Sequence, residues 1–276
     1  MIVDSHLHVW RAAESETTAV RTIVPPQTDV PIELARQTMA EHRVERAVLV
    51  QPVFRGEDNS YVAQCARDDP DKFAAVCVVD PRIPDAERRL AYWVNQGCRG
   101  LRLRPRIPAE TAIFGDPATY PLWGAAQRLG VVVSLLASPE HVPMVGRLAE
   151  RFPQVPIVID HLGHPNTSSE AAMSGFRPLL DLARHSQIYL KLSGFHHFSR
   201  ERFPYSDCWP LVRAAYDQFG PERLLWGSDF PHVLVASSYA RSMMVSDQAL
   251  VDWSAADHES LMGANALRLY WPRPQS

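Results

Sequence analysis

The feature of this sequence that most constrains its fold is an eightfold alternation of short apolar runs with longer stretches of helical spacing. The apolar runs are rich in β-branched residues, which predicts strands at 2–8, 46–51, 73–79, 99–104, 131–136, 156–162, 188–194 and 223–229. Helices are predicted near 32–43, 59–69, 85–96, 119–129, 140–151, 171–185, 207–219 and 257–269. Because parallel neighbours need a crossover of about a dozen residues or more, usually a helix, this order predicts a parallel sheet.

Eight strand–helix units predict that the sheet closes into a barrel. A (β/α)8 barrel takes about 250 residues, and this chain has 276. We therefore expect an α/β fold with a single TIM-barrel domain over residues 1–276. A doubly wound open sheet is the alternative, but no GxGxxG motif follows the first predicted strand.

Composition and charge argue against several classes of protein. The net charge is −3 and no basic block is present, so nucleic acid is not an expected partner. No apolar run approaches the ~20 residues of a membrane-spanning helix, so no membrane is expected either. The four cysteines form no CxxC pair, which argues against a disulfide framework and fits the reducing cytoplasm. We expect a cytoplasmic protein with a small-molecule partner, and the sequence leaves open whether it forms a homo-oligomer.

Two histidines lie at the end of the first predicted strand. Side chains two positions apart on a strand point the same way, so His6 and His8 are expected to share a face with Asp4. In a TIM barrel the chemistry sits at the C-terminal ends of the strands and in the loops that follow. The ring nitrogens of two imidazoles side by side in a core are difficult to supply with hydrogen-bond partners unless the imidazoles bind a ligand.

Two other strand ends carry candidates for the same site. His161 follows Ile157 and Ile159 in the same phase, and Asp229 stands at the tip of the last strand. Taken singly, each has a structural explanation, since a histidine there is often a hydrogen-bonded core residue and an aspartate can cap the next helix. Three imidazoles and a carboxylate at one mouth together favour a catalytic site.

Five motifs in order carry a family resemblance: DSHLHVW, GLRLRP, IVIDHLGHP, YLKLSGF and LLWGSDFPH. They resemble the amidohydrolase-related family of the amidohydrolase superfamily, and within it the branch of 2-pyrone-4,6-dicarboxylate and sugar-acid lactonases. The resemblance covers essentially the whole chain. It implies an amidohydrolase-like TIM barrel that hydrolyses the ester bond of a small acidic or sugar-type lactone.

The resemblance also implies roles for four residues. Asp229 would be the general base that takes a proton from water, while His6, His8 and His161 would polarise the carbonyl that the water attacks. A positioned base contributes roughly 10²- to 10⁴-fold, and donors aimed at the developing oxyanion add electrostatic stabilisation.

The sequence departs from metal-dependent members of the superfamily. Those usually add a ligand from strand four or five, but these strands read GLRLRP and VVVSLLA here. His6, His8 and Asp229 could still hold a single divalent metal such as zinc, since three ligands plus water make an acceptable site. Arg102 and Arg104 would disfavour a cation beside them. The prediction is that no cofactor is required, with zinc left open.

Substrate contacts are predicted for inward-facing polar residues near the strand ends and for loop residues. An arginine fork suits a carboxylate. By the resemblance, His164, three residues beyond His161, stands where the pyrone-dicarboxylate enzyme has an arginine, which argues against the same dicarboxylate. The alternative for Arg104 is that it lies in the loop and forms an ion pair with an aspartate or glutamate on the rim. The predicted substrate-binding residues are Arg102, Arg104, Lys191, Ser193, His164, Gln51 and His196.

Two other functions compete with a lactonase. One is a metal-dependent aromatic-acid decarboxylase of the same superfamily, which the absence of a histidine on strand five disfavours. The other is a non-catalytic barrel that binds a small acid, which the presence of Asp229 disfavours.

Overall fold

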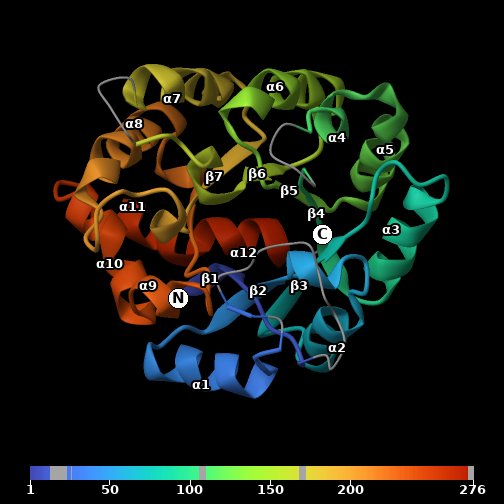
Figure 1. Ribbon diagram of the computed structural model, residues 1–276, viewed down its shortest axis with the longest axis horizontal. Helices are drawn as coiled ribbons and strands as arrows, with labels where there is room; N and C mark the ends of the chain where they lie inside the picture. Colours follow the sequence, from blue (N-terminus) through green and yellow to red (C-terminus); the bar gives the residue numbers. More distant parts are fainter. Residues whose placement is uncertain (13–23, 26, 106–109, 168–171, 273–276) are drawn as a thin grey trace.

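The computed structural model describes residues 1–12, 24–25, 27–105, 110–167 and 172–272. Eight parallel strands follow one another in chain order around a barrel (Figure 1). Their bounds are β1 Val3–Leu7, β2 Arg46–Val50, β3 Phe73–Val78, β4 Cys98–Leu103, β5 Val132–Leu135, β6 Ile157–Ile159, β7 Ile188–Leu192 and β8 Leu224–Trp226. The predicted α/β fold, a TIM barrel, is confirmed.

Two hydrogen bonds close the barrel between β8 and β1. The Asp229 N–H donates to the His6 carbonyl at 2.8 Å, and the His8 N–H donates to the Phe230 carbonyl at 2.7 Å. Leu7 and Phe230 form a parallel bridge at the same place. The seam of the barrel therefore runs through three of the residues predicted to be catalytic.

Helices form a ring outside the strands (Figure 1). Their bounds are α1 Ile32–Glu41, α2 Ser60–Asp68, α3 Ala86–Asn95, α4 Ala112–Gly115, α5 Tyr120–Leu129, α6 Val142–Arg151, α7 Ala172–Leu180, α8 Trp209–Phe219, α9 Val233–Ala236, α10 Tyr239–Ala249, α11 Ala255–Glu259 and α12 Asn265–Tyr270. The last predicted helix is interrupted by a π-turn at Ser260–Ala264. Among the described residues, no helix combines the length and the apolar content that crossing a membrane would need.

The N-terminal end of the barrel is filled by an apolar layer. Figure 1 shows α12 lying across the barrel, and its Ala266 and Tyr270 belong to one apolar cluster with buried side chains from six strands. A histidine or arginine at this level would be buried without a partner, whereas the residues present are apolar. The strand residues of this layer are Val3, Val48, Val50, Ala74, Val76, Val132, Val158 and Leu225.

Strands β6 and β8 end earlier than predicted. β6 stops at Ile159, and beyond it His161 adopts a left-handed backbone with a φ of 53°. Asp229, three residues beyond β8, also has a positive φ, of 60°. Ile157 and Ile159 belong to the core between barrel and helices, so the phase argument for His161 is wrong: a turn, rather than strand alternation, brings it to the site.

The expectation that Asp4 shares a face of the strand with His6 and His8 is also wrong. The register of β1 shifts between Asp4 and Leu7, which breaks the alternation on which that expectation depends. The Asp4 carboxylate instead accepts hydrogen bonds from the Ser228 N–H at 2.9 Å and from the Tyr239 hydroxyl of α10 at 2.8 Å. Asp4 therefore ties β1 to the segment after β8 and to a surrounding helix.

Candidate active site

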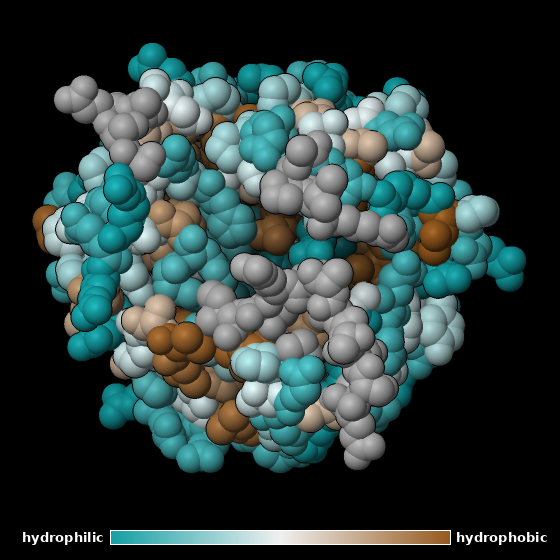
Figure 2. Space-filling model, viewed as in Figure 1, coloured by the Kyte–Doolittle hydropathy of each residue, from teal (hydrophilic) through white to brown (hydrophobic). Residues whose placement is uncertain are grey.

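A pocket of about 430 Å³ opens at the C-terminal ends of the strands. The face drawn in Figure 2 is hollowed near its centre. TIM-barrel enzymes place their chemistry at this mouth. The lining residues are His8, Pro52, Val53, Phe54, Arg102, Arg104, Leu136, His161, His164, His197, Phe198, Asp229 and His232.

The Asp229 carboxylate lies among four imidazoles at the floor of the pocket. Its Oδ2 is 2.7 Å from His197 Nε2 and 3.2 Å from His196 Nε2. Its Oδ1 is 3.5 Å from His8 Nε2 and 3.7 Å from His6 Nε2. The predicted convergence of His6, His8 and Asp229 is thus present in the structure.

Burial by itself would raise the pKa of Asp229. The neighbouring His161 imidazole, the close approach of His196 and the hydrogen bond from His197 outweigh burial and hold that pKa well below its usual range. Asp229 is therefore an ionised carboxylate at neutral pH. An ionised carboxylate is the form that can accept a proton from water.

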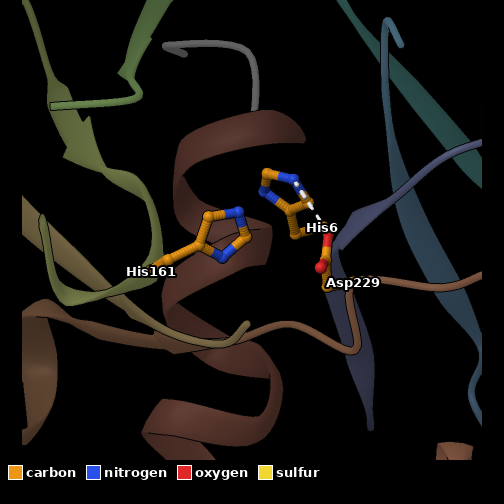
Figure 3. Close-up of side chains that lie close together, drawn as sticks. All are labelled: His6, His161 and Asp229. Atoms are coloured by element: carbon orange, nitrogen blue, oxygen red, sulfur yellow. Dashed lines mark ion pairs between the residues drawn. The ribbon is translucent and has the colours of Figure 1, made fainter. Parts of the chain in front are cut away.

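His161 reaches the same space from the opposite side (Figure 3). Its ring centroid lies 4.7 Å from that of His6, and its Nδ1 is 2.9 Å from Ser193 Oγ. Burial lowers the pKa of His161 well below its usual value, and the Asp229 carboxylate opposes that shift. At Gly194, where φ is 62°, an added Cβ would come within 2.4 Å of His161 Nδ1. The glycine of the YLKLSGF motif therefore makes room for this ring.

His6 and His8 are held by different groups. His8 Nδ1 lies 2.7 Å from the Val50 carbonyl oxygen, while His6 Nδ1 lies 3.1 Å from Lys191 Nζ. Burial, with a further contribution from the Lys191 charge, lowers the pKa of His6 to about 3. Gly227 gives His6 its space, because a Cβ there would lie 2.7 Å from His6 Cβ.

A buried group of charges lies beneath His6. Asp160 Oδ1 is 3.1 Å from Lys191 Nζ and 3.4 Å from His6 Nδ1, and Asp160 Oδ2 is 3.1 Å from Arg102 Nε. Burial would raise the pKa of Asp160, but Lys191, His6 and Arg102 together hold it well below its usual range. Burial lowers the pKa of Lys191 and Asp160 opposes that shift.

The structure divides the predicted substrate-binding residues into two groups. Arg102, Arg104 and His164 line the pocket. Three others are buried and hydrogen-bonded within the protein: Lys191 to His6, Ser193 to His161, and Gln51 Nε2 to the carbonyl oxygens of Gly56 and Asp58. The seventh, His196, approaches Asp229 Oδ2 at 3.2 Å.

Three residues of the site were not among the sequence candidates. Asp160 has the phase of the inward-facing Val158, a signal that counting in twos along β6 would have found. His197 follows the predicted His196, and His232 ends the LLWGSDFPH motif and packs 5.3 Å from the His8 ring. Neither has a strand periodicity that would mark it, because each lies in a loop after a strand.

Ligand atoms for one metal ion are close together in this site. Those of His6, His161 and Asp229 all lie within 4.8 Å of one another, and His196 and His197 form a second such group with Asp229. A metal-bound histidine normally donates its other ring N–H to an acceptor. Lys191 Nζ, which carries only donors, occupies that position at His6. The surroundings of His6 therefore do not fit a metal ligand.

Comparison with known proteins identifies relatives of this chain. The amidohydrolase family model matches residues 3–271. L-fucono-1,5-lactonase from Burkholderia ambifaria is 30% identical over 239 residues, which are 83% of this chain and 80% of that protein. 4-Sulfomuconolactone hydrolase from Rhizobium radiobacter is 27% identical over 230 residues, covering 83% of this chain and 75% of that protein.

Solved structures give the same result. An amidohydrolase from Burkholderia multivorans with bound zinc superposes with a TM-score of 0.84 at 25% identity, covering 98% of this chain and 99% of that one. 2,6-Dihydroxybenzoate decarboxylase from Rhizobium superposes with a TM-score of 0.68 at 16% identity over 98% of both chains, a likeness of fold alone. With a family model matched over nearly its whole length, the chain belongs to the amidohydrolase family.

Proposed function

We propose that this protein hydrolyses the ester bond of a small lactone that carries an acidic group. The observation that carries the proposal is the ionised Asp229 carboxylate at the floor of a pocket that is also lined by His161 and two arginines. The names of the two relatives described above, an L-fucono-1,5-lactonase and a 4-sulfomuconolactone hydrolase, support it.

Asp229 acts as the base. Its carboxylate takes a proton from a water molecule, the water oxygen bonds to the lactone carbonyl carbon, and the carbonyl electron pair moves to the oxygen. Ring N–H groups of His6 and His161 stabilise that oxygen. The ring C–O bond then breaks, and the proton held by Asp229 passes to the leaving alkoxide, which gives an open-chain hydroxy acid.

His8 orients the attacking water. The Val50 carbonyl can only accept, so His8 Nδ1 carries a proton. In the neutral ring, Nε2 then presents a lone pair. This lone pair lies 3.5 Å from Asp229 Oδ1. One water molecule can donate a hydrogen to each of these two acceptors, which directs its own lone pair into the pocket.

Arg104 recognises the acidic group of the substrate. Arg102 Nε is paired with Asp160, whereas Arg104 lines the pocket and forms no ion pair within the part of the chain that the structure describes. Burial and the Arg102 charge lower the pKa of Arg104, and a bound carboxylate or sulfonate would relieve both effects. Phe54, Leu136 and Phe198 supply apolar surface for the ring.

The test is a panel of pyrone, muconate and sugar lactones assayed with and without a chelator. We expect ring opening that survives chelation and is fastest for a lactone with one acidic group. Chelator-sensitive release of carbon dioxide from an aromatic acid would instead assign the decarboxylase function. Saturable binding of an acidic lactone with no turnover would assign a non-catalytic barrel.

A further inference from the structure

Lys191 has no place in the proposed chemistry, although it lies directly beneath it. The side chain belongs to β7 and is completely buried, as are Asp160 and His6. It spans 185 positions of sequence to contact His6 Nδ1 at 3.1 Å. Arg102 already pairs with Asp160 at 3.1 Å, so one cation is present to balance that carboxylate without Lys191. Charge balance at Asp160 therefore does not explain why a second cation, Lys191, is buried here.

The contact with Lys191 determines where the His6 proton lies. A lysine amino group next to a ring nitrogen donates to it, and an ammonium has no acceptor at all. His6 Nδ1 must therefore accept, which means that it is unprotonated. A neutral imidazole carries one N–H, so the proton of His6 is on Nε2.

The Nε2–H of His6 points to where a ligand oxygen would sit. This nitrogen is buried and has no hydrogen-bond partner among the described residues. It lies 3.7 Å from Asp229 Oδ1, and the His161 ring faces it across the same space (Figure 3). Buried donors without a partner are rare in folded proteins because each is costly. An oxygen atom at the bottom of the pocket would satisfy this one.

His8, two residues along the same strand, has the opposite tautomer. Its Nδ1–H donates to the Val50 carbonyl, which in the neutral ring leaves a lone pair on Nε2. A ring N–H donated to a carbonyl or a carboxylate is the usual arrangement of a metal-bound histidine. His8 has that arrangement and His6 does not, because Lys191 stands where the acceptor would be.

We propose that Lys191 is a positioning residue that holds His6 in its Nε2–H tautomer, so that His6 is a hydrogen-bond donor in the site and a poor metal ligand. The target of that donor, the carbonyl oxygen of a lactone, rests on the proposed function. The tautomer and the poor metal affinity do not rest on it, and both can be measured without turnover.

Replacing Lys191 with methionine reverses the arrangement. Asp160 Oδ1, 3.4 Å from His6 Nδ1, then becomes the polar atom nearest to that nitrogen. A carboxylate only accepts, so the proton of His6 moves to Nδ1 and the lone pair moves to Nε2. This creates the carboxylate–histidine pair that supports metal ligands, and it removes a donor from the site. Asp160 keeps Arg102 as its counterion, so the buried charges stay balanced.

The first experiment reads the tautomer directly by ¹⁵N NMR of the histidine-labelled protein, with the His6 signals assigned by comparison with His6→Gln. We expect wild-type His6 to be protonated at Nε2 and Lys191→Met to be protonated at Nδ1. Protonation at Nδ1 in the wild type would overturn the proposal even if the variant did not fold.

The second experiment titrates metal-free protein with zinc in a calorimeter. We expect Lys191→Met to bind zinc at least ~10-fold more tightly than the wild type. Arg102→Met is the matched control, because it removes the other cation from Asp160 but leaves the Lys191 contact with His6. We expect it to keep the wild-type tautomer and zinc affinity. Equal zinc affinity in all three proteins, with an unchanged tautomer in Lys191→Met, would overturn the proposal.

Turnover separates this inference from the proposed function. On any lactone that the wild type opens, Lys191→Met should lower kcat by about 10²-fold with a smaller change in KM, since an oxyanion donor acts mainly in the transition state. If the wild type opens no lactone but shows the expected tautomers, the proposed function fails and the role of Lys191 stands.

Discussion

His197 Nε2 lies 2.7 Å from Asp229 Oδ2, the shortest of the four imidazole contacts that this carboxylate makes. The carboxylate is held between the loop that follows β7 and the end of β1. Its position is therefore defined by residues from two segments of the chain that lie far from it in the sequence.

Asp229→Asn should lower kcat by about 10²-fold or more, because the amide keeps the shape of the side chain but cannot accept the proton of water. Circular dichroism should show an unchanged fold. Asp247→Asn, on α10, is the matched control and should retain full activity. Wild-type turnover in Asp229→Asn would exclude this residue as the base.

His197→Phe should lower kcat about 10-fold, since a hydrogen bond to a charged group contributes about 1.5–3 kcal/mol. Loss of this bond also raises the pKa of Asp229, so the acidic limb of kcat/KM should move to higher pH. The measurement is a pH–rate profile beside that of His258→Phe, a control on α11. Superimposable profiles for His197→Phe and the wild type would contradict a role in holding the carboxylate.

Arg104→Met should raise KM for acidic lactones by about 10-fold or more and leave kcat nearly unchanged, because a group that binds the ground state and the transition state equally affects KM alone. A neutral lactone should show no difference. Arg128→Met, which removes a surface arginine paired with Glu87, is the control. A similar rise in KM for neutral and acidic lactones would argue against recognition of an anion by Arg104.

Gly194→Ala should destabilise the fold and displace His161. The positive φ alone costs on the order of 1–3 kcal/mol, and the new methyl would press on His161 Nδ1 at 2.4 Å. Gly130→Ala is a close control, since its φ is 64° and nothing lies within 4 Å of its added Cβ. In Gly194→Ala, both the free energy of unfolding measured in urea and the turnover should fall. In Gly130→Ala, only the free energy of unfolding should fall. Equal activity in the two variants would show that His161 tolerates the methyl.

Stability should fall as the pH drops below about 6.5. Burial lowers the pKa of His6 and of His232 to about 3, and that of His164 to about 4, from 6.5. Between these values the unfolded chain binds the extra protons, so each histidine lowers the free energy of unfolding by about 1.4 kcal/mol per pH unit of acidification. Urea unfolding at pH 7 and pH 5 measures the effect.

His232→Phe provides the control for that pH dependence. It removes one of the histidines that bind a proton on unfolding, so the loss of stability between pH 7 and pH 5 should be smaller by about one histidine's share. A wild-type free energy of unfolding that does not change over this range would contradict neutral burial of the three rings.

The barrel and part of its site follow from local patterns in the sequence. Strands and helices repeat with periods set by backbone geometry alone, so their order predicted the parallel barrel. The same period of two placed Arg102 and Lys191 inside the barrel, and it would have placed Asp160 there through Val158. Nothing local marked the register shift at Asp4 or the left-handed turn that carries His161 inward, because both depend on how neighbouring segments meet.

What the sequence by itself determined is which residue types stand at the strand ends, and therefore that an acid and several imidazoles meet at one mouth. The tertiary structure alone decided what each of them can do. The protonation of a buried ring depends on the nearest donor or acceptor, and for His6 that partner is Lys191, 185 positions away in the chain. Two histidines of one short motif thereby receive opposite tautomers.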